Sequence, residues 1–335
     1  MAPHIWGSAL SFMAGLHLAF ASPCATVLGF SLGANPLLRA LVEQPIICDN
    51  GFISAPTRPR SAMLAFVLRP SFVGVRPSSF VHTPRRHPML IKACLNGSRA
   101  PGTHPALPLT PTQLADAARD AVAAGAGALH IHPRRADGSQ SFEPHDVAAA
   151  VTALRAACPG VPIGSTTAAW VEPDPARRLA LVRSWTMRPD FVSVNFSEAG
   201  TEQLCAAVLQ SGIGIEAGLS TAEDARLLIE TRLAGRCVRL LIEPDEPETD
   251  AALVAVRAIE ALLDGAGIRA PRLLHGSEAT AWPLLDEALR CGYDTRIGFE
   301  DTLALPDGSP ARDNAQLVAV ARERAARAAR VDAHG

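Results

Sequence analysis

Residues 110–133 read TPTQLADAARDAVAAGAGALHIHP, and this stretch contains the repeating unit from which the fold is predicted. The opening Thr-Pro-Thr-Gln has the pattern of a helix N-cap with a capping box, and an Ala-rich amphipathic segment follows it. A Gly-Ala-Gly sequence ends that helix. The mostly apolar run at 128–133 is typical of a buried strand, so the stretch predicts a helix that leads into a parallel strand.

The same alternation continues on both sides, with eight short apolar segments separated by amphipathic helices. Short strands of this kind indicate a parallel sheet covered by helices. Eight units after Met89 have the size and number of a (βα)8 TIM barrel. A doubly wound open sheet is the alternative, but Asn-Gly-Ser-Arg at 96–99 is not the Gly-rich phosphate motif that would favour it. The predicted strands are 89–96, 128–133, 162–167, 191–196, 213–219, 238–243, 272–275 and 295–300.

Residues 1–88 are a different kind of sequence. They contain seven Arg, no Lys and two acids, which gives a formal charge of +5, whereas residues 89–335 carry −7. An apolar stretch at 5–38 lacks a positive n-region and is interrupted by Pro and Gly, so it predicts neither a signal peptide nor a membrane helix. We therefore expect residues 1–88 to be a poorly ordered or dispensable N-terminal extension, and residues 89–335 to form the catalytic barrel.

The composition of the whole chain excludes some partners. Its 335 residues carry a formal net charge of −2, which gives no electrostatic footprint for nucleic acid or an anionic membrane. The seven Cys are an odd number without a Cys-x-x-Cys pair, which indicates reduced thiols in a cytoplasmic protein. The chain is long enough to bury a core without disulfides.

Polar residues end the predicted strands, which a barrel kept only for its shape would not need. In a (βα)8 barrel the active site lies at the carboxyl ends of the strands. We therefore expect a site built from several strands. The polar residues at these ends are Asn96, His130, His132, Thr166, Thr167, Ser193, Asn195, Glu216, Glu243, His275, Glu300 and Asp301.

His130 and His132 form the strongest candidate for a metal site. Residues two apart on a strand point to the same side, with Cα atoms about 6.5–7 Å apart, so both imidazoles can reach one ion. Such a pair is also common as two hydrogen-bonded polar residues. Glu300, at the end of another predicted strand, can supply a third ligand. Two His and one carboxylate suit zinc best, and other divalent transition metals are also compatible.

Glu300 and Asp301 are adjacent acids that cannot both point inward from a regular strand. A turn beginning at Asp301 would bring both to the rim, with Glu300 on the metal and Asp301 as a general base. Arg296 lies five residues before Asp301 and could hold that carboxylate ionised and oriented. An ordinary Arg-Asp pair that closes the barrel is the alternative interpretation.

Four motifs point to one enzyme family: PALPLT at 105–110, AGAGALHIHPR at 124–134, VNF at 194–196 and RIGFED at 296–301. With Asn-Gly after the first strand, they resemble the β-keto acid cleavage enzyme family, typified by 3-keto-5-aminohexanoate cleavage enzyme. The resemblance covers residues 89–325 and none of 1–88. It implies a zinc-dependent (βα)8 enzyme that assembles as a homo-oligomer.

The resemblance also implies a reaction, in which acetyl-CoA and a β-keto acid give acetoacetate and a new acyl-CoA. His130, His132 and Glu300 would bind zinc. Asp301, oriented by Arg296, would remove the proton between ketone and carboxylate. The carbanion would attack the acetyl thioester, CoA would move within the adduct, and a retro-Claisen cleavage would release the products. The positions that match the family's substrate-binding residues are Thr166, Ser193, Asn195 and Glu216.

Arg99 departs from the family pattern, because the typical member has an acid there that helps to bind the substrate's ammonium group. We expect Arg99 to contact the substrate, to disfavour an amino-substituted β-keto acid and to prefer a neutral or anionic one. The hydroxyls at 165–167 leave it uncertain, by one position, which of them faces the substrate. The loop after His275 could bind CoA phosphates through backbone amides, and His275 could be a fourth metal ligand or an ordinary hydrogen-bonded residue.

Two other functional classes stay open. A metal-dependent hydrolase on this barrel typically takes further His ligands from strands five and six, where this chain has Glu216 and Glu243. A non-catalytic binding barrel with a vestigial metal site would not need Arg296 and Asp301 beside Glu300. The residues therefore favour a cleavage enzyme over both.

Overall fold

The computed structural model describes residues 89–332, together with five two-residue strands nearer the N-terminus. The chain divides into two compact units, Met1–His82 and Thr83–Gly335. In the first unit, β1 and β2 pair in parallel and β3, β4 and β5 pair antiparallel. The prediction of a poorly ordered or dispensable extension over residues 1–88 otherwise lies outside the described residues. The five short strands are β1 (His4–Ile5), β2 (Gly29–Phe30), β3 (Cys48–Asp49), β4 (Phe52–Ile53) and β5 (Phe66–Val67).

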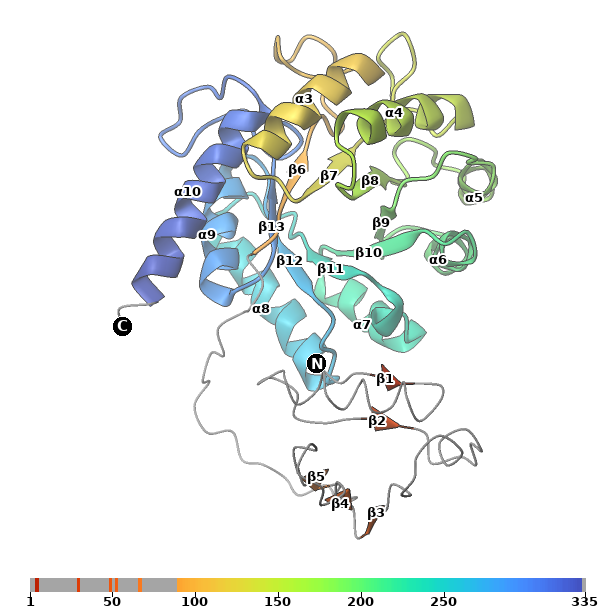
Figure 1. Ribbon diagram of the computed structural model, residues 1–335, viewed down its shortest axis with the longest axis vertical. Helices are drawn as coiled ribbons and strands as arrows, with labels where there is room; N and C mark the ends of the chain where they lie inside the picture. The colour runs from red at the N-terminus through yellow and green to blue at the C-terminus, as the bar shows by residue number, and fades with distance from the viewer. Residues whose placement is uncertain are drawn as a thin grey trace, which may run out of the picture. The chain divides into compact units, whose positions relative to one another are not determined.

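Eight parallel strands form a nearly closed barrel in the second unit, as predicted (Figure 1). The strands from β6 to β12 are neighbours in sequence order, and β13 pairs with β6. Two backbone hydrogen bonds of 3.0 Å, from Leu274 to Asp294 and from Asp294 to Arg272, connect β12 with β13. The strands are β6 (Ile91–Cys94), β7 (Ala128–Ile131), β8 (Ile163–Thr166), β9 (Phe191–Asn195), β10 (Gly214–Leu219), β11 (Arg239–Ile242), β12 (Arg272–Leu274) and β13 (Thr295–Ile297).

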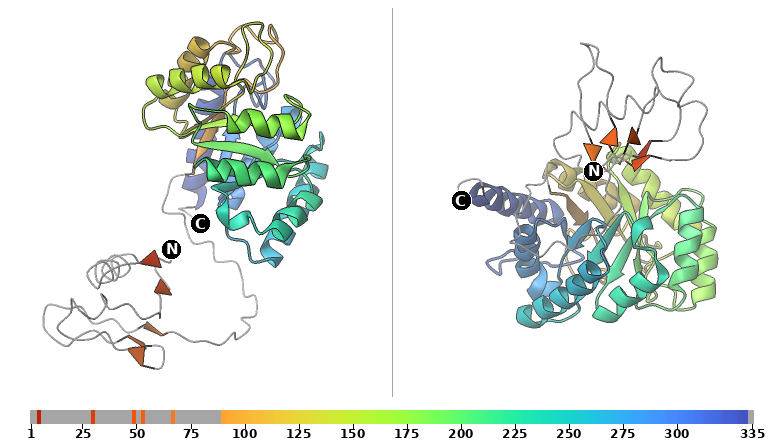
Figure 2. Two further views of the ribbon diagram at one scale, coloured as in Figure 1. Left: turned by 90° about the vertical axis from the view of Figure 1, so that its right-hand side faces the viewer. Right: turned by 90° about the horizontal axis from the view of Figure 1, so that it is seen from below.

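Helices alternate with the strands and surround them (Figure 2). The first of them begins as predicted, with Thr110 as N-cap and Gln113 completing the capping box. The helices are α3 (Pro111–Ala123), α4 (Pro144–Ala157), α5 (Pro175–Arg183), α6 (Thr201–Gln210), α7 (Ala222–Thr231), α8 (Thr249–Gly265), α9 (Ala281–Cys291) and α10 (Asn314–Asp332), with short 3-10 helices η1 (Ala234–Arg236) and η2 (Glu278–Thr280).

Each of the eight strands is one to four residues shorter than its predicted range. Helix α7 begins with a capping box of Thr221 and Asp224, and the Asp224 carboxylate accepts from the backbone N–H groups of both Ser220 and Thr221. The last strand ends at Ile297 and not at residue 300, because the chain turns at Gly298. This earlier turn determines how the acids after β13 enter the site.

Side chains along each strand alternate between the helices and the barrel interior. On β7, Leu129 and Ile131 belong to the hydrophobic core shared with the helices, so His130 between them points inward. Two such hydrophobic clusters fill the layer between strands and helices. The inward positions carry many polar and charged side chains, so groups that can bind a ligand or transfer a proton lie inside the ring of strands.

No helix of the described residues combines the length and the apolar character needed to cross a membrane. The cysteines of residues 89–332 are all unbridged, as expected for reduced thiols. Burial raises the pKa of the Cys205 thiol to about 12, so this cysteine is not a reactive thiolate at neutral pH.

Candidate active site

Three side chains that can bind a metal meet at the carboxyl ends of the barrel strands. His130 and His132 come from the end of β7, and Glu300 follows β13, with β6 between those two strands. One ligand atom from each residue lies within 4.8 Å of the other two. His130 Nε2 is 3.7 Å from Glu300 Oε2, and His132 Nε2 is 3.5 Å from Glu300 Oε1. The structure therefore brings together the three predicted ligands.

The surroundings of these donors fit a metal ion. Glu300 Oε2 is buried without a hydrogen-bond partner. Gln140 hydrogen-bonds Nδ1 of His132, which leaves Nε2 to face the other ligands. Burial lowers the pKa of His130 well below its ordinary value, although Glu300 opposes this, so the imidazole is in the neutral form that binds metals. Two imidazoles and a carboxylate suit zinc or another divalent transition metal.

Asn96 fixes the backbone that carries His132. Its side chain is fully buried, accepts from His132 N at 2.9 Å and donates to His132 O at 2.9 Å. It also donates to the carbonyl of Pro108 at 3.2 Å. Asn96 therefore positions one of the metal-binding side chains through the backbone, without being a ligand itself.

Glu300 and Asp301 reach the site through the turn at Gly298. The amide of Asp301 donates to the carbonyl of Gly298 at 2.9 Å, and the amide of Glu300 donates to the carbonyl of Cys94 at 3.1 Å. A Cβ at position 298 would lie 2.0 Å from that Cys94 oxygen, so a side chain there would push β6 away. Gly97, with φ +55°, also lies close to the acidic turn, since a Cβ at this position would lie 2.4 Å from Glu300 Cγ. Two glycines thus allow the acidic turn to dock on the end of β6.

Arg296 connects the two acids. Its Nη2 lies 3.0 Å from Glu300 Oε1 and 2.7 Å from Asp301 Oδ1, and its Nε lies 3.0 Å from Asp301 Oδ1. Asp301 Oδ2 is buried and has no hydrogen-bond partner. One oxygen of Asp301 is therefore held, and the other is available to a ligand.

The two acids differ in their pKa. Burial raises the pKa of Glu300, but Arg296 and the two histidines outweigh burial and bring that pKa well below its ordinary range. Burial also raises the pKa of Asp301, and here the charge of Arg296 does not overcome it, so the pKa is above its ordinary value. Arg296 thus lowers the pKa of Asp301, as the sequence suggested, but desolvation, which the sequence alone does not show, outweighs this effect. A raised pKa makes Asp301 a stronger base.

Three predicted substrate-binding residues share the inward face of neighbouring strands. Thr166 at the end of β8 pairs with Ser193 on β9, and Asn195 follows two residues later. Alternation along β8 turns Ser165 toward the helices and Thr166 inward. Thr167, just beyond the strand, donates to the carbonyl of Ser193 at 2.6 Å. Of the three hydroxyls that the sequence left open, Thr166 is the inward one on the strand.

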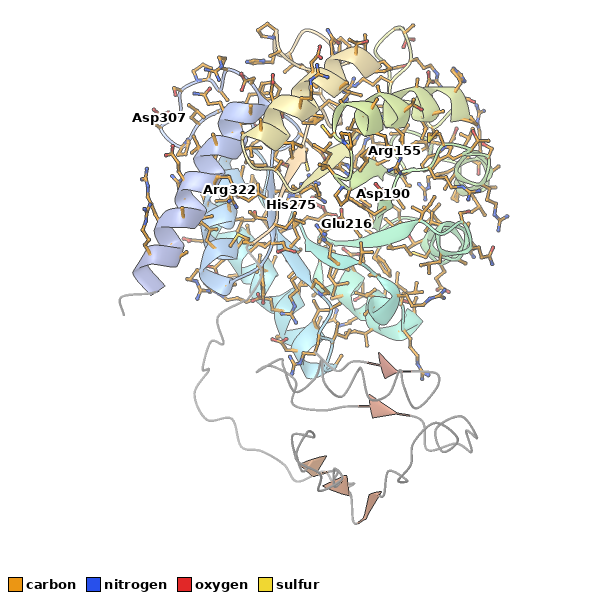
Figure 3. All side chains as sticks on the ribbon, in the orientation of Figure 1. Arg155, Asp190, Glu216, His275, Asp307 and Arg322 are labelled. Atoms are coloured by element: carbon orange, nitrogen blue, oxygen red, sulfur yellow. The ribbon has the colours of Figure 1, made fainter. Side chains whose placement is uncertain are left out.

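Glu216 does not lie at the carboxyl end of its strand, contrary to expectation. It is the third residue of β10 and is fully buried within the ring of strands (Figure 3). Its carboxylate forms an ion pair with Lys92 and lies 3.3 Å from Arg239 Nη1. The Phe191 ring covers both cations, with 5.6 Å from Lys92 Nζ to the ring centroid. Glu216 is therefore paired with cations inside the barrel, before the carboxyl end of its strand.

Arg99 lies at the rim, but its charge is compensated. Its Nη2 is 2.7 Å from Glu278 Oε1, and its Nε donates to the carbonyl of Phe299. Glu278 adopts a positive φ of 49°, which is unusual for a residue other than Gly. Arg99 is therefore paired with Glu278 at the rim, and its predicted effect on an amino-substituted substrate stays a prediction.

Sequence reasoning missed two residues of the site and one contact. Gln140 gave no signal, because its contact with His132 depends on a hairpin after β7. Trp170 is 58% exposed, and its ring lies at 17° to the ring of His132 with centroids 6.4 Å apart. His275 Nε2 bonds Glu243 Oε2 at 2.9 Å, and the metal cluster found among the described residues does not include His275.

Comparison with known proteins now decides the family. Residues 88–232 and 245–334 match the family described as beta-keto acid cleavage enzyme. The chain belongs to this family. The matched residues of this β-keto acid cleavage enzyme include both the His-x-His pair and the Arg-x-Gly-x-Glu-Asp segment. A comparison with curated protein sequences gave no match.

Solved structures show the same fold. The chain is similar to ObcA in a ternary complex with a C4-CoA adduct and oxalate, with a TM-score of 0.56 and 16% identity over 65% of this chain and 63% of that chain. It is similar to apo ObcA with a TM-score of 0.55 and 16% identity, over 65% of this chain and 61% of the other. The chain thus spans less than two thirds of the length of ObcA, and at 16% identity the likeness shows the fold alone.

Proposed function

We propose that this member of the β-keto acid cleavage enzyme family converts a β-keto acid and acetyl-CoA into acetoacetate and a new acyl-CoA. The supporting observation is the cluster of His130, His132 and Glu300 with Asp301 beside it, bound by Arg296 through one oxygen only. A base next to a metal site suits the removal of a proton beside a carbonyl, because the metal can stabilise the negative charge that forms on the oxygen.

Zinc is the proposed cofactor, held by His130, His132 and Glu300. When bound, the ion would act as a Lewis acid that polarises the ketone and stabilises negative charge on its oxygen. Asn96 and Gln140 would keep the imidazole of His132 in place, the first through the backbone and the second through Nδ1.

Asp301 is the proposed base. Its Oδ2 would take the proton from the carbon between ketone and carboxylate, while Arg296 keeps Oδ1 engaged. The resulting carbanion would attack the acetyl-CoA carbonyl and release the CoA thiolate. The thiolate would then add to the original ketone, and cleavage of the C–C bond would give the new acyl-CoA. Asp301 would return its proton to the departing fragment, which becomes acetoacetate.

Thr166, Ser193 and Asn195 are the proposed contacts for the substrate's carboxylate and oxygens, from the inward faces of β8 and β9. Glu216 and Arg99 would act indirectly. The ion pair of Glu216 with Lys92 would lie at the bottom of the pocket, and the ion pair of Arg99 with Glu278 would lie at its rim.

The test is a panel of β-keto acids incubated with acetyl-CoA and the metal-loaded full chain. We expect acetoacetate and a new acyl-CoA in equal amounts for at least one substrate. Release of acetate and CoA without acetoacetate would favour a metal-dependent hydrolase. Metal binding without turnover of any β-keto acid would favour a non-catalytic barrel.

A further inference from the structure

We propose that Glu243, together with Asn195, recognises a hydrogen-bond donor on the substituent that the β-keto acid carries at its ketone. The donor would be a hydroxyl or an amine. This inference rests on the proposed function and assigns the substrate-selecting acid to the residue that follows β11, whereas the sequence pointed to Glu216 on β10.

Glu243 lies across the barrel from the metal cluster. In the ring of eight strands, β11 is the fourth strand from β7, so these two strands face each other. Ile242 belongs to the helix-facing core, so the next residue points inward. The side chain of Glu243 is 17% exposed, whereas that of Glu216 is 0% exposed. A substrate held by the metal on one wall would therefore extend toward Glu243 on the other.

Two oxygen atoms converge beside Gly218, on the strand between Asn195 and Glu243. A Cβ at this glycine would lie 2.2 Å from Glu243 Oε1 and 2.8 Å from Asn195 Oδ1. The missing side chain thus lets the Glu243 carboxylate lie across β10 toward Asn195. Any larger residue would displace it.

The amide of Asn195 is oriented by Glu198. Glu198 Oε1 accepts from the backbone N–H of Ala169 at 2.9 Å and from Asn195 Nδ2 at 2.9 Å. An oxygen that already accepts a backbone N–H requires the NH2 group of Asn195, so Oδ1 is the atom that faces Gly218. Two acceptors then lie side by side, and such a pair favours a donor between them.

His275 holds the other oxygen of Glu243. Its Nε2 is 2.9 Å from Glu243 Oε2, and its Nδ1 is 3.7 Å from Asp301 Oδ1. Burial lowers the pKa of His275 to about 3, so the ring is neutral and donates one N–H to the Glu243 carboxylate. This bond fixes the carboxylate and leaves Oε1 to contact the substrate.

The test compares kcat/KM for 3-oxohexanoate with the values for its 5-hydroxy and 5-amino derivatives, using the metal-loaded full chain. Wild type should prefer at least one derivative by about tenfold or more, the worth of one hydrogen bond. Glu243→Gln should lower that ratio at least about tenfold, chiefly through KM, because its NH2 would donate to Asn195 Oδ1 and satisfy both groups internally. Gly218→Ala should do the same by displacing the carboxylate.

Glu248→Gln is the matched control, since Glu248 is an exposed acid at the end of the same loop and caps no backbone N–H with its side chain. It should keep the wild-type ratio. Loss of preference for the amine alone would identify an ammonium partner, and loss for the hydroxyl alone a neutral one. Metal content at wild-type level would show that Glu243→Gln and Gly218→Ala are folded. If only one of the two variants folds, that variant alone tests the inference.

The failures are distinguishable. If wild type makes no acetoacetate from any of the three substrates, the proposed function fails. If wild type makes acetoacetate but shows no preference for a donor, or if the folded variants keep the preference, the inference is wrong.

Discussion

Arg296 binds Asp301 on one side only: its Nε and Nη2 lie 3.0 and 2.7 Å from the same oxygen, Oδ1, while Oδ2 is buried without a partner. A carboxylate that is to accept a proton needs one oxygen left open, and this geometry provides it. Since Nη2 also contacts Glu300, one guanidinium holds both the proposed base and a proposed metal ligand.

Asp301→Asn should reduce acetoacetate formation by at least about 100-fold, because the amide cannot accept the substrate proton. Metal content should not change, since none of the three clustered ligand atoms belongs to Asp301. Turnover and bound metal measured on the same preparation check this. Wild-type turnover in the variant would remove Asp301 from the mechanism.

Arg296→Lys should lower kcat by about 100-fold, because a single ammonium cannot reproduce the guanidinium fork and the base would move. The KM for acetyl-CoA should change little, since Arg296 bonds the two acids rather than the mouth of the barrel. Steady-state kinetics with both substrates varied will separate the two constants. A change confined to KM would argue against a positioning role.

Gln140→Leu should weaken metal binding about 10- to 100-fold, because His132 would lose the bond that orients its ring. Gln203→Leu, at an exposed position of α6, is the control and should bind metal as wild type does. Competition against a chelator of known affinity measures the effect. Equal affinities in the two variants would show that Gln140 does not support the site.

Glu243→Gln should gain stability relative to wild type as pH rises. Burial raises the pKa of Glu243 from 4.5 to about 7 in the folded protein, with Arg296 opposing, so ionising it costs the native state. That cost is absent below pH 4.5, grows up to about pH 7 and then levels off at on the order of 3 kcal/mol. Melting temperatures of both proteins from pH 4.5 to 8 test this. Parallel curves would contradict the raised pKa.

The barrel could be predicted because its signals are local. Each strand is a short apolar run, and each helix carries its own start signal, such as the Thr110 capping box. The ligands His130 and His132 were predictable for the same reason, since their spacing alone places both on one side of a strand. Periodicity and spacing therefore identified the scaffold and the pair of histidines in the metal cluster.

Contacts between distant strands could not be predicted in this way. Glu216 was expected at a strand end, but Lys92 and Arg239 pair with it from two other strands. Arg99 was expected to carry its charge to the substrate, but it pairs with Glu278, which is 179 residues later in the sequence. Burial and pairing of this kind depend on the register of the closed ring, which no single segment encodes.

The most direct test of the proposed function follows the acetyl group. Acetyl-CoA labelled with carbon-13 at the acetyl carbonyl is incubated with a β-keto acid and the metal-loaded full chain, and the products are examined by NMR. We predict that the label appears at the ketone carbon of acetoacetate and that an equal amount of unlabelled acyl-CoA forms. Label released as acetate, or label that stays in the CoA thioester, would contradict a β-keto acid cleavage reaction.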